Sequence, residues 1–456
     1  MTSTIKVNNI QNQCGANIIN ESSNTITIGA SGDTVSLASG ASQTGFGRTG
    51  TVDWQTSSIK TATFTAANGE GYFCNTTSGS FTVNLPAGSA GAIVSIQDYN
   101  NTFDTNSLTV DANGSEKING GDAGQPVTLS TEGLGITFVY IDSTVGWRSV
   151  QSNEYATAGL TPAYISATGG TITTVCTNFK VHTFTGPGTF CVSCAGNASG
   201  SNTVSYMVVA GGGGGGGSHG GGGGAGGFRE GKATTCSYTA SPLNAPAGIT
   251  IPASGPYSVT VGGGGTPGGA ATSGANGGTG GVSTFSTITS AGGGGGATES
   301  SGPGLDGGSG GGGTYNPNHN VGGNGNTPPV SPPQGQPGGT GQVQAGPYHA
   351  AGGGGAKCAG SDFNSSDGKG GDGQTTSINA TPTAFAGGGG AGGTSYCQPG
   401  AGAGGTGGGA AGGGPVSAGS AGTVNTGGGG GGGYAAPAQA GGSGGSGIVI
   451  IRYKFQ

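Results

Sequence analysis

The sequence predicts an all-β protein with a short N-terminal β segment, a β-sandwich-like module, and a small β-sheet base that carries a polyglycine II helix bundle. Three observations support this. Short apolar runs alternate with period two between turn-forming residues, as β-strands do. No window keeps the i, i+3, i+4 apolar stripe of an amphipathic α-helix. Glycine makes up 114 of the 456 residues, and most of it lies between two apolar runs, 206–210 and 448–453.

Composition and charge narrow the possible functions. Only 7% of residues are charged, the net charge is −6 and no run of Lys or Arg exists, which argues against a nucleic-acid partner. Residues 1–6 lack the basic-then-apolar pattern of a secretory signal. No apolar stretch approaches the ~20 residues that span a bilayer. We therefore expect a protein that is made in a cytoplasm, inserts into no membrane and bypasses standard secretion.

Residues 1–56 are expected to form an attachment or oligomerisation segment. The stretches 25–29 and 33–37 alternate with period two, and turn-forming residues separate them. Two strands of this length bury too little apolar surface to fold alone. Three copies around an axis would bury more, so this segment predicts a homotrimer.

Residues 57–152 are expected to form a β-sandwich-like spacer domain. Turn signals separate short apolar runs at fairly even spacing, which is typical of a sandwich or barrel. Trp147 is expected to anchor the core or an edge of this domain, and a linker at 153–170 follows it. The predicted strands cover residues 61–65, 71–75, 80–85, 92–98, 107–111, 127–130, 135–141 and 146–150.

Residues 171–456 are expected to form one further domain, whose β-sheet base is made by 171–210 and 447–456. We expect the strand 448–455 to pair with 205–209, although more than two hundred residues separate them. The glycine-rich stretch 211–446 would then leave and re-enter the same sheet. The other predicted strands of the base cover residues 171–174, 180–185, 189–192 and 203–210.

The glycine-rich stretch has three physical options: a flexible coil, a collagen-like helix or a polyglycine II bundle. Collagen needs glycine at every third position, which this stretch lacks. A flexible linker has no need of the strand-like runs 257–261 and 282–288 between its glycine blocks. In a polyglycine II bundle, extended threefold helices lie side by side and hydrogen-bond to one another, because no Cβ holds their backbones apart. We therefore favour the bundle.

Side chains that could carry catalysis are sparse. Cys191 and Cys194 have the spacing of a metal or redox pair, but no second pair and no histidine at ligand spacing accompany them. A strand-end pair that is free or joined by a local disulfide is the simpler interpretation. The four histidines lie in no recognisable catalytic motif, and acidic residues stand mostly beside glycine, as in turns. The sequence predicts no enzyme, no cofactor and no metal site.

Three segments carry a resemblance to a known family. They are residues 206–217 (YMVVAGGGGGGG), 257–265 (YSVTVGGGG) and 441–453 (GGSGGSGIVIIRY). Together they resemble the glycine-rich domain of phage tail-fibre proteins, and they are similar in principle to the polyglycine tip adhesins of T-even-like phages. The resemblance covers about residues 180–456. It implies a homotrimeric or tip-mounted virion fibre that binds a host surface receptor.

Two N-terminal segments, 71–79 and 138–147, also resemble modules of marine phage fibres. In the resembling adhesins, loops at the distal end of the glycine helices carry specificity. The loops of this chain hold aromatic, amide and imidazole groups, which suit recognition of a glycan or an outer-membrane protein. The candidate receptor-binding residues are Tyr238, Tyr315, Asn318, His319, Tyr348, His349, Phe363, Tyr396 and Tyr434.

Each of these residues has an alternative role as a structural cap on the end of the glycine bundle. Cys358 and Cys397 would join two loops by a disulfide if those loops lay side by side. For the whole chain, we expect a virion tail-fibre protein that binds a host surface glycan or outer-membrane protein, with residues 1–56 contacting other tail proteins. The alternative is a virion decoration or extracellular filament subunit whose loops bind nothing. A depolymerase fibre is disfavoured, because carboxylates do not cluster.

Overall fold

The computed structural model describes residues 9–11, 17–22, 25–28, 52–150, 160–197, 199–271, 274–342, 349–362, 368–394 and 400–456. Within these ranges every helix or strand is a β-strand, which confirms the predicted all-β class. No helix in the described ranges is long and apolar enough to cross a bilayer. The chain divides into two compact units, Met1–Gly159 and Leu160–Gln456, and each is described by itself.

The first unit begins with a small antiparallel sheet. Its strands are β1 (Asn9–Gln11), β2 (Asn17–Ser22) and β3 (Thr25–Ile28), in the order β1-β2-β3. Strand β3 matches the predicted stretch 25–29, and its described partner is β2. The other predicted strand, 33–37, lies outside the described residues.

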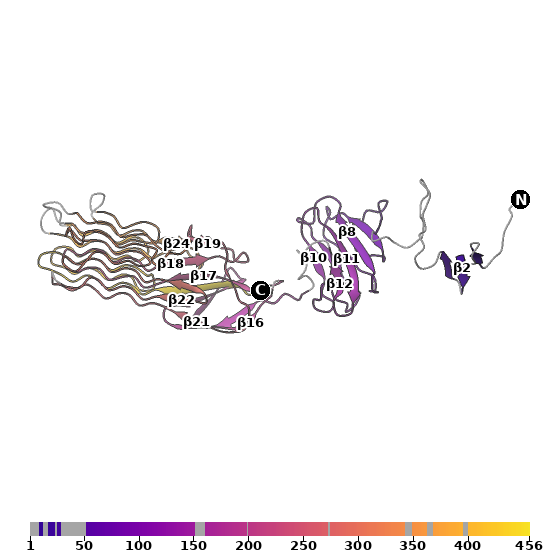
Figure 1. Ribbon diagram of the computed structural model, residues 1–456, viewed down its shortest axis with the longest axis horizontal. Helices are drawn as coiled ribbons and strands as arrows, with labels where there is room; N and C mark the ends of the chain where they lie inside the picture. The colour runs from indigo at the N-terminus through magenta and orange to yellow at the C-terminus, as the bar shows by residue number, and fades with distance from the viewer. Residues whose placement is uncertain are drawn as a thin grey trace. The chain divides into compact units, whose positions relative to one another are not determined.

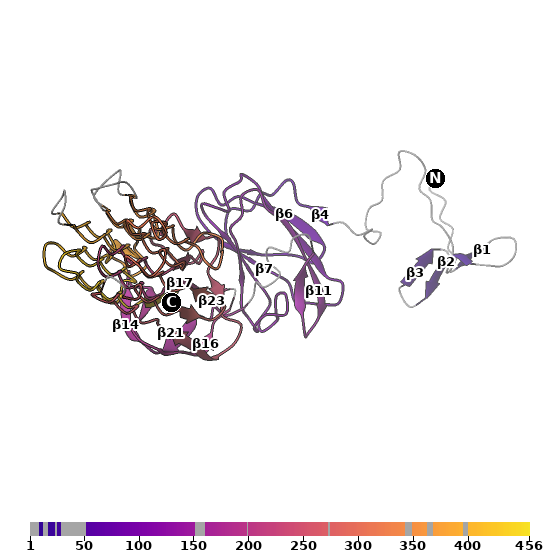
Figure 2. The ribbon, with the colours of Figure 1, turned by 60° about the vertical axis from the view of Figure 1, so that its left-hand side comes forward.

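The rest of the first unit is a β-sandwich. Its strands are β4 (Asp53–Trp54), β5 (Phe64–Thr65), β6 (Glu70–Cys74), β7 (Thr82–Asn84), β8 (Ile93–Asp98), β9 (Leu108–Asp111), β10 (Val127–Leu129), β11 (Gly135–Asp142) and β12 (Gly146–Ser149). One sheet has the order β12-β11-β8-β6-β4 and the other the order β10-β9-β7-β5. Figure 2 labels β4, β6 and β11 of the first sheet and β7 of the second. All eight strands predicted for this module are present. Strand β4 lies in the range that the sequence analysis assigned to the N-terminal segment, yet it pairs with β6.

Consecutive strands from β4 to β9 alternate between the two sheets. Neighbours within a sheet therefore run parallel in the pairs β4–β6, β6–β8, β5–β7 and β7–β9. The inner faces enclose one apolar core, in which Phe103, Phe138 and Trp147 are fully buried. Trp147 is a core anchor, and its indole N–H donates to the Glu116 carboxylate at 3.0 Å.

The second unit has a base of two larger sheets and one two-stranded antiparallel sheet, β24-β25. Its strands are β13 (Ile165–Thr168), β14 (Thr171–Val175), β15 (Phe179–Phe184), β16 (Gly188–Ala195), β17 (Thr203–Val209), β18 (Phe228–Gly231), β19 (Asn244–Ala245), β20 (Ile249–Thr250), β21 (Gly255–Thr260), β22 (Ser283–Phe285), β23 (Ile288–Ser290), β24 (Gln374–Thr376), β25 (Thr383–Phe385) and β26 (Ile448–Lys454). One sheet has the order β13-β16-β21-β22-β23. The other has the order β14-β15-β26-β17-β18-β19, and β20 also pairs with β17. Strand β13 lies within the stretch 153–170 that the sequence analysis took as a linker.

The predicted pairing between the two ends of the glycine-rich stretch is confirmed. Strands β17 and β26 are antiparallel neighbours, with Val209 opposite Ile448 and Ser205 opposite Arg452. The glycine-rich stretch therefore leaves this sheet after β17 and returns to it at β26.

Both strands are apolar on both faces because both faces are covered. Val208 points into the core between the two base sheets. Met207, its neighbour, packs on the opposite face against a cluster that includes Ile378 and Phe385. A continuous apolar run, rather than an alternating one, is the expected pattern for a strand in this position.

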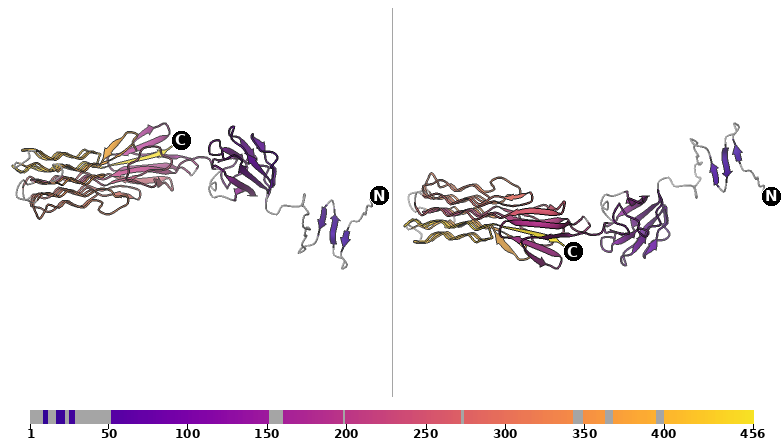
Figure 3. Two further views of the ribbon diagram at one scale, coloured as in Figure 1. Left: turned by 90° about the horizontal axis from the view of Figure 1, so that it is seen from above. Right: turned by 90° about the horizontal axis from the view of Figure 1, so that it is seen from below.

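The glycine segments form a polyglycine II bundle, in which they run side by side away from the strands (Figures 1 and 3). Along residues 211–216, successive N–H groups donate in rotation to three neighbouring segments, with N···O distances of 2.8–3.0 Å. The carbonyl groups accept in the same rotation from three others. The donor-side neighbours are 277–281, 442–445 and 221–224, and the acceptor-side neighbours are 265–268, 293–296 and 430–433. This period of three, with six surrounding segments, is the geometry of packed threefold helices.

Glycine is required in the middle of the bundle because the backbones approach so closely. A Cβ on Gly213 would overlap the carbonyl oxygen of Gly294, and one on Gly216 would overlap that of Ala297. The bundle is thus held mainly by backbone hydrogen bonds between its segments, each with a net contribution of ~1 kcal/mol, rather than by side chains.

Candidate binding surface at the far end of the glycine bundle

The glycine bundle has two different ends. At the base end the segments join strands, since Gly211 follows β17 and Gly447 precedes β26. At the opposite end, which we call the far end, the chain turns back between segments (Figure 1). The described turns at the far end include residues 217–220, 298–303, 314–320, 414–417 and 434–439. The non-glycine residues of these turns are the candidate binding surface.

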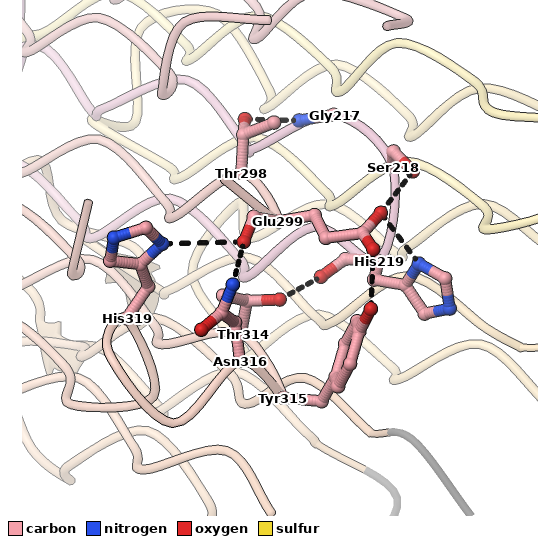
Figure 4. A network of polar contacts seen from close by, with 9 residues as sticks. All are labelled: Gly217, Ser218, His219, Thr298, Glu299, Thr314, Tyr315, Asn316 and His319. Atoms are coloured by element: carbon pink, nitrogen blue, oxygen red, sulfur yellow. Dashed lines mark hydrogen bonds and ion pairs between the residues drawn. The ribbon is translucent and has the colours of Figure 1, made fainter. Parts of the chain in front are cut away.

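A polar cluster, the Glu299 cluster, joins three of these turns (Figure 4). Its residues are Ser218, His219, Glu299, Tyr315, Asn316 and His319. The Glu299 carboxylate accepts a hydrogen bond from Ser218 Oγ at 3.2 Å and another from the Tyr315 hydroxyl. His219 Nδ1 lies 3.4 Å from the same carboxylate, and the His219 and Tyr315 rings pack with centroids 4.6 Å apart.

The backbone of the cluster is tied as well. The Glu299 carbonyl accepts from Asn316 Nδ2 at 2.8 Å and lies 3.3 Å from His319 Nδ1. Thr314 Oγ1 donates to the His219 carbonyl at 2.9 Å. These bonds connect turns far apart in the sequence, so they fix the positions of the turns relative to one another.

His219 is largely buried, and its charge state follows from burial. Desolvation lowers its pKa, whereas the neighbouring Glu299 carboxylate raises it, and the lowering is the larger effect. We therefore treat His219 as neutral at pH 7, so that its contact with the Glu299 carboxylate is not an ion pair. The turn itself is tight, because Ser218 and His219 have φ values of +33° and +52°.

Three of the sequence-predicted residues lie together in one far-end turn. Tyr315 and His319 are half-buried and face the Glu299 cluster, whereas Asn318 is exposed between them. Of these three residues, Asn318 is the one whose side chain is exposed to solvent. The other two have polar groups already engaged within the protein.

Two more of the predicted residues are also at the far end but are buried. His349 is 7% exposed and Tyr434 is 4% exposed. The Tyr434 carbonyl accepts from the Gln439 N–H at 3.0 Å, which closes the turn between two glycine segments. Both side chains therefore fit the alternative role of caps on the bundle.

The predicted residues Tyr348, Phe363 and Tyr396 lie outside the described residues. For Tyr348 the flanking backbone is described. Gln342 donates its N–H to the His349 carbonyl at 3.1 Å, so this loop begins and ends at the far end.

Tyr238 lies at the base end, not with the far-end loops. Its ring packs beside the buried Arg452 guanidinium, 5.2 Å from the ring centroid, and beside Lys232 Nζ at 5.3 Å. Burial raises the pKa of its hydroxyl well above the ordinary range. The sequence analysis grouped Tyr238 with the other loops because it follows a glycine block, but its loop packs against β26 through Arg452.

None of the described cysteines lies in a far-end turn. Cys358 is a free thiol in a base-end turn, where its carbonyl accepts from the Gly355 N–H, and Cys397 lies outside the described residues. Cys191 and Cys194 are both free and exposed on β16. Across the described ranges no group of three or more His, Cys, Asp or Glu side chains is placed to hold a metal ion.

The sequence analysis missed an exposed valine at the far end. Val416 is 67% exposed and has a φ of +57°, a conformation that a β-branched residue rarely adopts. Pro415 precedes it, and the Ser417 N–H donates to the Gly414 carbonyl at 3.0 Å, as in a type II turn. That turn ordinarily has glycine at this position, so the sequence Gly-Pro-Val-Ser was the available signal. A second valine, Val321, is 58% exposed after the 314–320 turn.

Part of the chain matches a known protein family. The model of a family described as "Glycine-rich domain" matches residues 183–454. No curated protein matches the chain.

Proposed function

The chain belongs to the glycine-rich domain family, and from this premise we propose that it is a virion tail-fibre protein that binds a host surface receptor through its far-end turns. In this proposal the protein acts outside the cell as part of the virion. Residues 1–56 contact other tail proteins, and the sandwich serves as a spacer. Catalysis is not part of the proposal.

The observation that carries the proposal is the segregation of side chains within the second unit. The middle of the bundle is nearly all glycine and is held by backbone hydrogen bonds. Non-glycine residues stand in the turns at both ends of the bundle, and those of the far-end turns gather away from the base strands. A frame nearly free of side chains, joined to turns that carry diverse side chains, is suited to presenting a recognition surface on a fixed support.

The exposed groups of these turns indicate what kind of receptor they suit. The 314–320 turn exposes Pro317 and Asn318, and the 414–417 turn exposes Pro415 and Val416. None of these four side chains is charged. Amide and small apolar groups of this kind suit a glycan or the loops of an outer-membrane protein. Single contacts would be weak, and several copies on one particle would make attachment firm.

The strained valine provides a sharp test. Val416→Gly should relieve the positive φ and stabilise the second unit by about 1 kcal/mol, yet remove an exposed apolar contact. Particles carrying Val416→Gly together with Asn318→Ala should assemble normally and adsorb at least tenfold more slowly to host cells. The matched control is Val424→Gly, because Val424 is equally exposed at 66% but lies in a base-end turn. Equal adsorption by the far-end variant and wild-type particles would place the receptor site elsewhere.

A structural role is the second candidate, and the buried caps favour it. His349 and Tyr434 are buried, and the Glu299 cluster faces inward, so part of the far end serves the bundle itself. A virion decoration or a filament subunit would need only a bundle whose far end is capped, and no receptor contact. Growth of open filaments from the purified chain would support that role, whereas a closed oligomer would support the fibre.

A further inference from the structure

The sandwich of the first unit carries a groove that the proposed function does not use. It lies on the outer face of the sheet β12-β11-β8-β6-β4 and has a volume of about 480 Å³. That volume is within the range of small-molecule sites, roughly 300–1,000 Å³. Side chains from β8 and β11 line it, and Val52, Trp54 and Val150 border it.

Three small residues, Gly71, Ser95 and Thr137, form the floor of the groove across the sheet, with Trp54 at one end of this row. Trp54 stands opposite Gly71, Gly71 opposite Ser95, and Ser95 opposite Thr137. A Cβ on Gly71 would overlap the Trp54 ring, so glycine is what lets the indole lie across the sheet. At the side of this row, Gln97 Oε1 occupies the space that a Cβ on Gly135 would need. Two glycines thus shape the groove.

One wall of the groove is aromatic and partly in solvent. Trp54 is 39% exposed, and its ring lies 5.0 Å from that of Phe73. Phe73 in turn lies 6.5 Å from Tyr99, which is 52% exposed. An exposed indole supported from behind by a second ring offers an apolar face of fixed orientation.

The polar groups beside this wall are neutral. The Ser95 and Thr137 hydroxyls are 2.7 Å apart, and the Gln97 amide donates to the carbonyls of Asp98 and Gly133. Among the described residues, no ionisable side chain lines the groove. Arg148 stands on the same face, opposite Val139 on the edge strand, but outside the lining. A charged ligand would find no opposite charge in the groove, whereas a neutral ligand with hydroxyls and an apolar face would match both walls.

We propose that this groove is a saccharide-binding site, in which Trp54 stacks on the apolar face of a sugar ring while Ser95, Gln97 and Thr137 exchange hydrogen bonds with its hydroxyls. The site is independent of the far-end turns and gives the first unit a binding role beyond that of a spacer. Stacking needs the indole, and glycine at position 71 lets the indole lie across the sheet.

Intrinsic fluorescence and calorimetry of the full chain test this site. The chain has two tryptophans, and Trp147 is fully buried, so a ligand-induced change in emission reports Trp54. The probes are cellohexaose, maltohexaose and chitohexaose, with trigalacturonate as a charged probe. We expect saturable emission change with at least one neutral hexaose and none with trigalacturonate. By calorimetry, Trp54→Ala should weaken binding of that hexaose at least tenfold.

Matched variants separate this proposal from its competitors. Gln97→Ala should weaken binding severalfold, and Gln125→Ala, outside the groove, should not. Val416→Gly should leave saccharide binding unchanged, so that failure of the far-end receptor site and failure of this site are distinguishable. Absence of saturable binding to all neutral probes would overturn the proposal. So would a smaller oligomer for Trp54→Ala in sedimentation velocity, because the face would then be an interface between copies of the chain.

Discussion

Individual glycines in the bundle differ in how much space surrounds them, and this difference can be measured. Gly213 lies in the central segment, where a Cβ would overlap a neighbouring carbonyl oxygen. Gly263 lies in a neighbouring segment, where a Cβ would meet no atom within 4 Å. Both have φ values outside the left-handed region, so only the surroundings distinguish them.

We predict opposite outcomes for alanine at these two positions. Gly213→Ala should destabilise the second unit by at least about 2 kcal/mol, because the backbones must separate and their hydrogen bonds lengthen. Gly263→Ala should stabilise it by about 0.4–1 kcal/mol, because alanine restricts the unfolded chain. Denaturant unfolding of the full chain measures both. Similar losses at both sites would contradict the close packing of the bundle.

At this same scale the sequence predicts where the turns are but not which way their side chains point. Tyr315 and Asn318 stand three residues apart in one turn, yet the first contacts Glu299 and the second is in solvent. Glu299 itself gave no signal, because it is a lone acidic residue in a turn far away along the chain. The burial of Tyr434 and His349 fits the alternative of structural caps, and the sequence alone does not predict which of the residues are buried.

The sequence predicted individual strands more completely than it predicted which strands pair with one another. The strands β17 and β26 stand out in sequence because burial on both faces makes them apolar throughout, and this also indicated their pairing. The sandwich strands alternate with period two, which specifies a face but not a neighbour. The sequence therefore did not predict the parallel strand pairs, which arise because strands β4 to β9 alternate between the two sheets. It did not predict the groove either.

The pairing of β15 with β26 predicts a pH dependence of stability. His182 on β15 is fully buried, with Nδ1 2.7 Å from the Gly169 carbonyl and Nε2 3.0 Å from the Tyr453 hydroxyl. Burial lowers its pKa below the ordinary value of 6.5, and Lys180 lowers it further, against the opposing effect of the Gly169 carbonyl. The folded state therefore holds this histidine neutral at pH values where the unfolded chain binds a proton.

The contribution of His182 to the free energy of unfolding should thus be constant above about pH 6.5 and fall below it. His182 should contribute a slope of up to about 1.4 kcal/mol per pH unit, and buried His219 should contribute similarly. His182→Asn and His219→Asn should each flatten the slope between pH 6.5 and 5 in urea unfolding of the full chain. An unchanged slope in both variants would show that other groups control acid sensitivity.

At the scale of the second unit, the repeated length of the glycine segments gathers the turns at one end. A segment of seven residues spans ~22 Å in a threefold helix at ~3.1 Å per residue. Segments of similar length that start from one base must turn at a similar height. This geometric consequence was predictable from the spacing of the glycine blocks. The order in which segments neighbour one another was not, because every glycine block offers the same hydrogen-bonding groups.

The small N-terminal sheet leads to a prediction about assembly of the whole molecule. Its strands have three, six and four residues, and Ile10 and Ile28 are 46% and 39% exposed. A sheet of this size with exposed isoleucines buries too little apolar surface to be stable alone. Packing against copies of itself would cover them, so we expect a homotrimer held by residues 1–56.

Sedimentation velocity of the purified full chain should show a species of three times 42.6 kDa. The double variant Ile10→Asp, Ile28→Asp should sediment as a monomer, because a charge in the shared core would be buried without a partner. The control is Ile172→Asp, since Ile172 on β14 is 42% exposed but belongs to the second unit. A wild-type monomer, or dissociation by the control variant, would rule out this sheet as the trimer contact. A trimer that dissociates only in the double variant would place three sets of far-end turns in one assembly, as the multivalent attachment proposed above requires.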